Sequence, residues 1–321
     1  MKKEVSLYTS TPEELESSLE ELRKNQRKNL HKDGNIMTSH KGADKWIFGV
    51  AFVIFALQCF TIILPFAWMI MSSFKEVNEY NLGGAFSLPT VWEFENYTEA
   101  FQSLNDPLTG TSFFGLIFNS IWYTVLTAGM ASIVPSVTGY VISKYRFPGR
   151  DFIYAVAIVA LTIPIVGSGA ASMKLWHQLN LYDNPLRVVV GGLGGFGGTF
   201  LVYYGFFKSV SWSYAEAAEI DGAGPYTVFF QIMLPQAVPI ILTYMITGAI
   251  GAWNEYQSII LYQPSFPTLA SGLFNYKSNT ARADIPVYYA GLVISMIPTL
   301  VLFSLCSSKI MTSISIGGLK G

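Results

Sequence analysis

Charged side chains are scarce in this chain. Aspartate, glutamate, lysine and arginine make up 13% of its 321 residues, whereas soluble domains carry about 25%. A surface so poor in charge predicts that lipid, and not water, covers most of the chain. The formal net charge of −1 also excludes the strongly positive field that binds nucleic acid.

Residues that bind metals or form cross-links are equally few. The two cysteines, Cys59 and Cys306, both fall within apolar runs, which argues against a disulfide framework. The three histidines are far apart in sequence and form no metal pattern. The chain also has no phosphate-binding Gly-Lys-Ser/Thr loop and no nucleophile–base set. We therefore expect no catalytic residue, no metal and no bound cofactor.

Long apolar runs are what the chain has in abundance. A transmembrane helix needs about 20 mostly apolar residues, and six stretches qualify. They are roughly 46–74, 113–143, 152–176, 186–207, 232–262 and 287–308. The expected fold is all-α, a polytopic integral membrane protein with six transmembrane helices over 46–310.

Positive charge beside the apolar runs predicts the orientation. The short link between the second and third runs carries Lys144, Arg146 and Arg150, which is typical of a cytoplasmic loop. The link 75–112 holds six acids against one lysine, which fits the outer side. Six crossings then place both termini and the loop 208–231 in the cytoplasm.

The first 45 residues form a polar extension. Thr11 suits a helix N-cap, and Leu15, Leu19 and Leu22 share one helical face. The pattern predicts a short amphipathic helix in a cytoplasmic extension over 1–45. A solvated helix is the simpler interpretation, and a contact with a partner subunit or the lipid surface is the alternative.

The loop 208–231 is acidic where a plain connector is expected. Ser213 and Glu216 have the spacing of a capping box, which predicts a short helix over 211–220. Alanines keep the surface of this helix small, and Gly222 then breaks the chain. Exposed carboxylates on a ridge of little bulk favour docking into a cleft on another protein.

The same loop resembles the Glu-Ala-Ala loop of ABC importer permeases. Glu-Ala-Ala stands at 216–218, and Gly222, Ile232 and Leu234-Pro235 follow at the family's spacing. Over 46–321 the chain is similar to maltose-importer-type permeases, which serve carbohydrate uptake. Other matching stretches are Phe147-Pro148-Gly149-Arg150, Trp253-Asn254-Glu255-Tyr256 and the ending Gly317-Gly318-Leu319-Lys320-Gly321.

The resemblance implies a set of partners in a bacterial cytoplasmic membrane. A second permease subunit would complete the translocation path, two ATPase subunits would bind ATP and Mg beneath it, and an external solute-binding protein would deliver sugar. The 212–224 segment would be the coupling helix, in which Glu216 pairs with a basic ATPase residue. The cytoplasmic tail is 311–321, and its part from Gly317 would reach the ATPase dimer interface. Coupling residues by this resemblance are Glu216, Ala217, Ala218, Asp221 and Gly222.

Polar and aromatic residues inside apolar runs are candidates for the substrate path, because they are costly in lipid. A sugar suits aromatic rings combined with amides and carboxylates. The candidates are Asn119, Trp253, Asn254, Glu255 and Tyr256. The alternative is structural: these side chains bond across helices or lie near the outer interface.

The glycine-rich stretch 192–197 formally matches a dinucleotide fingerprint. It follows no strand, so we interpret it as close helix packing through glycines four residues apart. Three other functions stay open for the chain as a whole. They are an importer permease for a non-sugar solute, an ion-coupled secondary transporter, for which Glu255 is a poor embedded acid, and, least favoured, a membrane enzyme.

Overall fold

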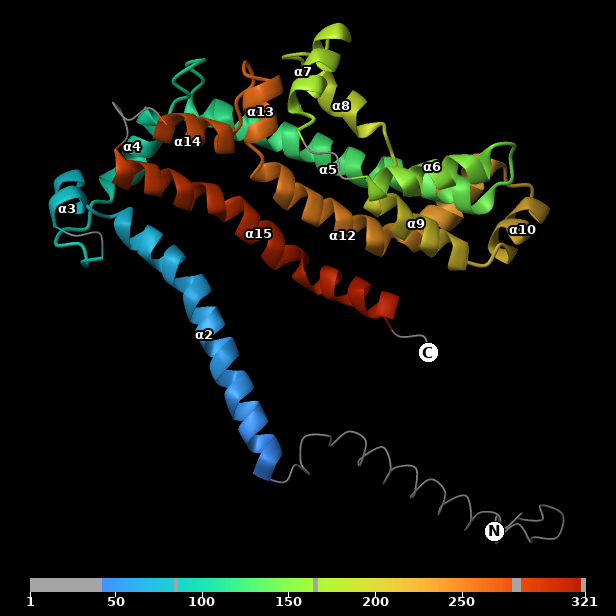
Figure 1. Ribbon diagram of the computed structural model, residues 1–321, viewed down its shortest axis with the longest axis horizontal. Helices are drawn as coiled ribbons and strands as arrows, with labels where there is room; N and C mark the ends of the chain where they lie inside the picture. Colours follow the sequence, from blue (N-terminus) through green and yellow to red (C-terminus); the bar gives the residue numbers. More distant parts are fainter. Residues whose placement is uncertain (1–41, 84–85, 164–166, 279–283, 319–321) are drawn as a thin grey trace. The chain divides into compact units, whose positions relative to one another are not determined.

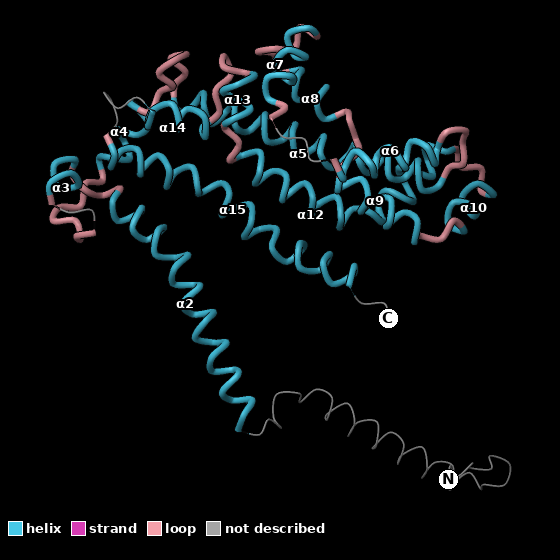
Figure 2. Tube along the Cα trace, in the orientation of Figure 1, coloured by secondary structure: helices cyan, strands magenta, loops and turns pink. Residues whose placement is uncertain are grey.

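A computed structural model describes residues 42–83, 86–163, 167–278 and 284–318 (Figure 1). These residues form helices and no strand, which confirms the all-α prediction for the described part of the chain (Figure 2). The amphipathic helix expected near Leu15 lies outside the described residues. The chain divides into two compact units, 1–66 and 67–321.

Four helices of the described residues are long and apolar enough to cross a membrane. They are Trp46–Ser72 within α2 (Gly42–Ser72), Phe113–Lys144 (α5), Pro225–Trp253 and Ile285–Cys306 within α15 (Ile285–Gly318). They overlap the first, second, fifth and sixth predicted spans, but the fifth runs over 225–253 and not 232–262, because α12 ends at Trp253 and residues 257–262 form a separate helix. Their length follows directly from uninterrupted apolar sequence, since prolines such as Pro135 in α5 are tolerated inside them.

The third predicted span is not one continuous helix. It consists of α6 (Arg150–Thr162) and α7 (Gly169–Gln178). Ile163 caps α6 in an extended conformation, at ψ 114°. The next residue in the sequence is Pro164, and a residue before proline is pushed out of the helical region by its ring.

The fourth predicted span is also divided, into α8 (Leu186–Gly192) and α9 (Gly198–Ser209). Gly195 has a φ of +61°, which breaks the helix between them. The prediction of a continuous packed helix over 192–197 is therefore wrong, but Gly195 does lie close to a neighbouring helix, α5. Thr138 donates a hydrogen bond to the carbonyl of Gly195 at 2.8 Å, and a Cβ on Gly195 would meet Thr138 at 2.9 Å.

Short helices connect the long ones. They are α3 (Val77–Leu82), α4 (Glu95–Ser103), α10 (Ser213–Ile220), α13 (Gln257–Tyr262) and α14 (Leu269–Ser278). The fifth span is built from α11 (Pro225–Thr227), the π-helix η1 (Val228–Met233) and α12 (Leu234–Trp253). The segments α11, η1 and α12 follow one another without a break and together make the fifth span. Within the second unit, α5 packs along both α12 and α9, and α15 packs along α12.

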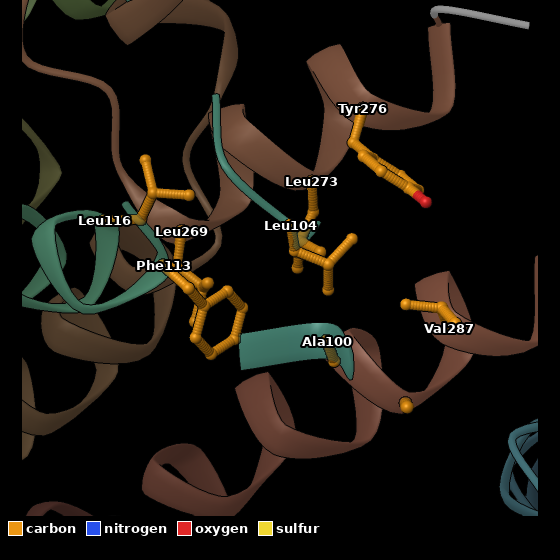
Figure 3. Close-up of a cluster of buried hydrophobic side chains, with 9 residues drawn as sticks. Ala100, Leu104, Phe113, Leu116, Leu269, Leu273, Tyr276 and Val287 are labelled. Carbon is orange, nitrogen blue, oxygen red and sulfur yellow. The ribbon is translucent and has the colours of Figure 1, made fainter. Parts of the chain in front are cut away.

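A buried apolar cluster joins α4, α5, α14 and α15. Ala100, Phe113, Leu273 and Val287 come from these four helices in turn and converge in Figure 3. Each is at most 3% exposed. Burial of this kind contributes about 25 cal/mol per Å² of apolar surface where water is the reference solvent. The cluster fixes α14 against α15 at one end of the long helices.

Candidate docking site

The loop 208–231 folds as a short helix followed by a turn. The helix, α10, begins at Ser213 and ends at Ile220. The prediction that Ser213 caps the helix is wrong. Trp212 occupies the N-cap position, and no side chain caps the helix. The helix begins at Ser213, one residue earlier than a Ser213 cap requires, and the backbone N–H of Ser213 donates to Ser211 Oγ at 3.3 Å.

One face of α10 is buried. Ala215 is 0% exposed and Ala218 is 8% exposed. Both pack on a cluster that we name the aromatic base, which also contains Tyr140, Tyr203, Phe207, Val228, Phe229, Met233 and Ala237. The methyl side chains allow the helix to lie close on these rings, so small residues here hold α10 against the ends of α5, α9 and η1.

Tyr140 is central to the aromatic base. Its ring centroid lies 4.7 Å from that of Phe229 and 5.3 Å from that of Phe207. Aromatic pairs at such separations are worth about 0.5–1.5 kcal/mol beyond their buried area. Tyr140 therefore ties α5 to both α9 and η1 directly beneath α10.

A lysine from the first basic loop fixes the start of α10. Lys144 Nζ donates a hydrogen bond to the carbonyl oxygen of Val210 at 2.5 Å. The same ammonium lies 6.0 Å from the ring centroid of Trp212, the cap residue. This lysine, which the sequence assigned only to orientation, thus joins the end of α5 to the beginning of the loop.

The C-terminus of α10 has the hydrogen bonds of a Schellman motif. The backbone N–H of Ala223 donates to the carbonyl of Ala218 at 2.9 Å, and that of Gly222 donates to Glu219 at 3.0 Å. Gly222 has a φ of +84°, a conformation that glycine adopts without penalty. The predicted break at Gly222 is confirmed as a structural feature.

The rest of the surface of α10 is exposed, together with Asp221 directly after it and Tyr226 in α11. It carries three carboxylates and three large apolar side chains, and we name this surface the docking face. Its residues are Tyr214, Glu216, Ala217, Glu219, Ile220, Asp221 and Tyr226. Ile220 is 86% exposed and Tyr226 is 82% exposed. Exposed apolar groups gathered in one place mark interaction surfaces.

The acids of the docking face have no ion-pair partner among the residues that the structure describes. Glu216 lies in the first turn of α10, where the helix dipole favours a negative charge. Glu219 and Asp221 lie at the other end, where the dipole disfavours one. The helix therefore gains no local stability from the latter two.

The docking face is joined to a long helix through a π turn. The π-helix η1 ends directly before Leu234 and Pro235. Proline has no N–H and its ring clashes with the carbonyl four residues earlier, so a wider turn accommodates it. Because α11, η1 and α12 are continuous, α10 is attached to one end of a 29-residue helical run.

The predicted path residues lie at the far end of this run. They make local or cross-helix hydrogen bonds: Asn119 Nδ2 donates to Pro267 O at 2.9 Å, and Trp253 Nε1 donates to Ser295 O at 3.0 Å. Glu255 Oε1 accepts from the backbone N–H of Ser258 at 2.8 Å. Trp253, Asn254 and Tyr256 line one cavity there, whose lining includes neither Asn119 nor Glu255. A role in the path stays a prediction for all five.

Comparison with known proteins finds a matching family and relatives that are transport permeases. Residues 131–314 match the family described as "Binding-protein-dependent transport system inner membrane component". The diacetylchitobiose uptake system permease protein NgcG of Streptomyces coelicolor is 30% identical over 282 residues, covering 86% of this chain and 90% of the relative. The maltodextrin permease MalD of Streptococcus pneumoniae is 26% identical over 265 residues, covering 81% of this chain and 91% of that protein.

A solved bacterial ABC transporter that imports alginate shares the fold. It aligns with a TM-score of 0.68 at 21% identity, over 85% of this chain and 99% of the other. The family match spans more than half of the chain and includes the whole docking face. The chain therefore belongs to the family of inner membrane components of binding-protein-dependent transport systems.

Proposed function

We propose that this chain is a permease subunit of an ATP-driven importer that carries a sugar or oligosaccharide into a bacterial cell. The membrane helices and the family support a transport component of the membrane. The names of its relatives support a carbohydrate as the cargo, since they include permeases for diacetylchitobiose, maltodextrin and galactooligosaccharides.

The docking face carries this proposal. Exposed Glu216, Glu219 and Asp221 surround apolar Ile220, on a helix whose other face is anchored to three membrane helices. Glu219 and Asp221, which bring the helix no local stability, suit a positive groove on a partner, and Glu216 adds a third negative charge to the same surface. We assign that groove to a separate ATPase subunit that binds ATP and Mg, with segment 212–224 as the coupling helix. In this role Glu216 pairs with a basic residue of the ATPase.

The anchoring of α10 gives a route for coupling. A force on the docking face reaches α5 through Lys144, α9 through Val210 and α12 through the π turn. ATP-driven closure of two ATPase subunits thereby moves the helices that surround the path. A second permease subunit forms the other half of that path, and an external binding protein delivers the sugar.

The basic loop and the acidic link 75–112 support an orientation with α10, both termini and the tail 311–321 in the cytoplasm. In this arrangement the chain crosses the membrane six times. The helix pair α6 and α7 makes the third crossing, and the pair α8 and α9 makes the fourth. The cavity lined by Trp253 then lies toward the outside.

The test is a charge reversal on the docking face. Glu216→Lys is expected to leave membrane insertion intact and to abolish co-purification with the ATPase and sugar uptake. Asp151→Lys is the matched control, because it reverses an exposed acid on α6 whose side chain is 92% exposed. Normal ATPase association by Glu216→Lys, or equal loss in both variants, would contradict the assignment.

The energy source and cargo are tested in proteoliposomes that hold the whole complex and its binding protein. Uptake of diacetylchitobiose, maltotriose or galactotriose is expected to need internal ATP and to survive an uncoupler. Uptake that an uncoupler stops would indicate ion coupling. Failure to take up any carbohydrate, with uptake of another solute, would refute the sugar assignment.

A further inference from the structure

Large apolar side chains are exposed in the acidic link 75–112, outside the membrane-length helices. They belong to α3 and to the segment 86–94 that follows it. Each is more than half exposed, and Leu82 and Phe86 reach 86% and 83%. We name this surface the apolar patch; its residues are Leu82, Phe86, Leu88, Val91, Trp92 and Phe94. Exposed apolar groups gathered in this way mark an interaction surface.

The segment 86–94 is fixed in place by hydrogen bonds and ring contacts. The backbone N–H of Thr90 donates to Glu79 Oε1 at 2.8 Å, and that of Glu93 donates to the carbonyl of Phe74 at 2.8 Å. The ring centroid of Phe74 also lies 5.3 Å from that of Trp92. The apolar patch is therefore presented by a held segment that is tied to the residues directly after α2.

Aromatic contacts join the apolar patch to the ends of α2 and α15. The ring centroid of Trp68 lies 5.9 Å from that of Phe86 and 5.3 Å from that of Tyr289. Tyr80 of α3 also contacts Tyr289, with ring centroids 5.9 Å apart. Trp68 lies about one turn before the end of α2, and Tyr289 about one turn after the start of α15. The segment with Phe86 thus folds back along two membrane-length helices instead of pointing away from them.

This level on the helices is where lipid headgroups meet hydrocarbon. Tryptophan and tyrosine concentrate there, because each combines an apolar ring with a polar group. Trp68, Tyr80 and Tyr289 form such a group at the ends of α2 and α15. An apolar surface at this depth lies beside acyl chains, where its exposure is favourable, whereas the same surface in water is not. Continuity with the membrane-length helices therefore favours lipid as the occupant.

The charges beside the apolar patch show which force holds it to lipid. Glu76 and Glu95, on either side of it in the sequence, are exposed. Lys75 is fully buried and donates through Nζ to Ser87 Oγ at 3.3 Å. Exposed carboxylates repel anionic headgroups, so binding depends on apolar contact and not on attraction to anionic lipid.

We propose that the apolar patch is an interfacial membrane anchor. It enters the boundary between headgroups and acyl chains beside α2 and α15 to a depth of about 5–10 Å, without crossing the bilayer. The anchor holds the end of α2 and the start of α15 at a fixed level in the membrane. It goes beyond the proposed transport function and does not depend on the cargo.

The test measures collisions of a spin label with oxygen, which concentrates in lipid, and with a neutral nickel chelate, which stays in water. Leu88→Cys, in a background with Cys59→Ser and Cys306→Ser, carries the label in the whole transporter in phosphatidylcholine nanodiscs. We expect frequent collisions with oxygen and few with the chelate. Leu108→Cys is the matched control, since Leu108 is 76% exposed in the polar turn 105–111 of the same link. Its label is expected to show the reverse.

A charge placed in the apolar patch tests whether apolar contact holds it. Val91→Asp is expected to raise the chelate collision rate at Leu88→Cys toward that at Leu108→Cys, because a carboxylate is costly in hydrocarbon. Val91→Ile keeps the apolar surface and is expected to leave the rate low. Replacing part of the phosphatidylcholine by phosphatidylglycerol is expected to bring no deeper insertion, because Glu76 and Glu95 repel it.

Four results would overturn the anchor. Frequent chelate collisions at Leu88→Cys would place the apolar patch in water, and exclusion of both reagents would show that a protein partner covers it. Equal chelate collision rates in Val91→Asp and Val91→Ile would remove the role of apolar contact. Insertion only with phosphatidylglycerol would indicate electrostatic capture. Each of these results leaves the proposed function standing, and a complex that imports no sugar leaves the anchor standing.

Discussion

Lys144 and Val210 are 66 residues apart in the chain, yet Lys144 Nζ donates a hydrogen bond to the Val210 carbonyl at 2.5 Å. The bond connects the last residue of α5 to the segment that leads into α10. Hydrogen bonds from charged groups are worth about 1.5–3 kcal/mol. The position of the docking face therefore depends on a residue in a different helix.

Lys144→Met tests this dependence. The variant keeps the length of the side chain and removes the donor, so we expect α10 to lose its anchor and the ATPase to bind roughly tenfold more weakly. Binding of the purified ATPase to the permease complex in nanodiscs measures the effect. Arg146→Met is the control, because Arg146 is exposed in the same loop. Equal weakening by both variants would show a general effect of loop charge.

The packing beneath the docking face gives a second prediction. A Cβ on Gly139 would lie 2.8 Å from Tyr203 Cβ and 2.9 Å from the backbone nitrogen of Tyr204. Since backbone cannot yield as a flexible side chain does, Gly139→Ala is expected to destabilise the α5–α9 contact by about 1–3 kcal/mol. Thermal denaturation of the purified complex measures the change as a lower midpoint.

Gly129→Ala is its matched control. Gly129 lies on the same helix, and a Cβ there meets nothing within 4 Å. Alanine is better than glycine inside a helix by about 1 kcal/mol, so this variant is expected to be neutral or slightly stabilising. A fall in the denaturation midpoint of similar size in both variants would refute the argument from close approach.

The turn after α10 gives a third prediction. A Cβ on Gly222 or on Gly224 meets nothing within 4 Å, so the two positions differ in backbone conformation and not in space. Gly222 has a φ of +84°, whereas Gly224 has a φ of −78°. Gly222→Val is expected to cost more than about 1–2 kcal/mol, because a β-branched residue is strained there.

Gly222→Val should therefore weaken ATPase binding at least tenfold, while Gly224→Ala should retain it. The measurement is again direct binding of the purified ATPase, and protease protection checks that each variant inserts into the membrane. If valine at position 222 bound the ATPase as well as the wild type, the left-handed turn would be unnecessary for the docking face.

The sequence predicted those features that depend on local pattern. Unbroken apolar runs such as 113–143 became long helices, and Gly222 became a turn because no other residue adopts its conformation so readily. The break within 192–197 was missed, since glycines at helical spacing permit both a packed helix and a turn. In the structure the turn at Gly195 is accompanied by a hydrogen bond from Thr138, a residue 57 positions earlier. A local sequence pattern does not contain such a contact.

The sequence analysis predicted the acidic residues of the docking face but missed its large apolar side chains. Ile220 and Tyr226 are visible in the sequence as large apolar residues within an acidic loop, a signal that could have been used. The anchor by Lys144 could not have been found, because its bond to Val210 joins the end of α5 to the end of α9, two helices far apart in the sequence. The stacking of Phe274 on Tyr256 also required the fold, since it joins α14 to the residue before α13.

A buried arginine in the first turn of α8 gives the last prediction. Arg187, only 8% exposed, donates through Nη2 to Gln263 Oε1 at 2.6 Å. Gln263 in turn donates to the carbonyl of Asn184 at 3.0 Å, and the Arg187 guanidinium lies 5.2 Å from the ring centroid of Tyr262. These contacts hold the segment before α8 against the segment after α13.

A double-mutant cycle with Arg187→Met and Gln263→Leu is expected to show a coupling free energy of about 0.5–3 kcal/mol. Each single variant leaves one buried polar group without its partner, whereas the double variant removes both, so it should be more stable than the sum of the two losses predicts. Thermal denaturation of the complex supplies the values. Ser265→Ala breaks an exposed bond to Asp183 in the same region and should change stability little. Additive losses in the cycle would mean that Arg187 and Gln263 support the two segments independently.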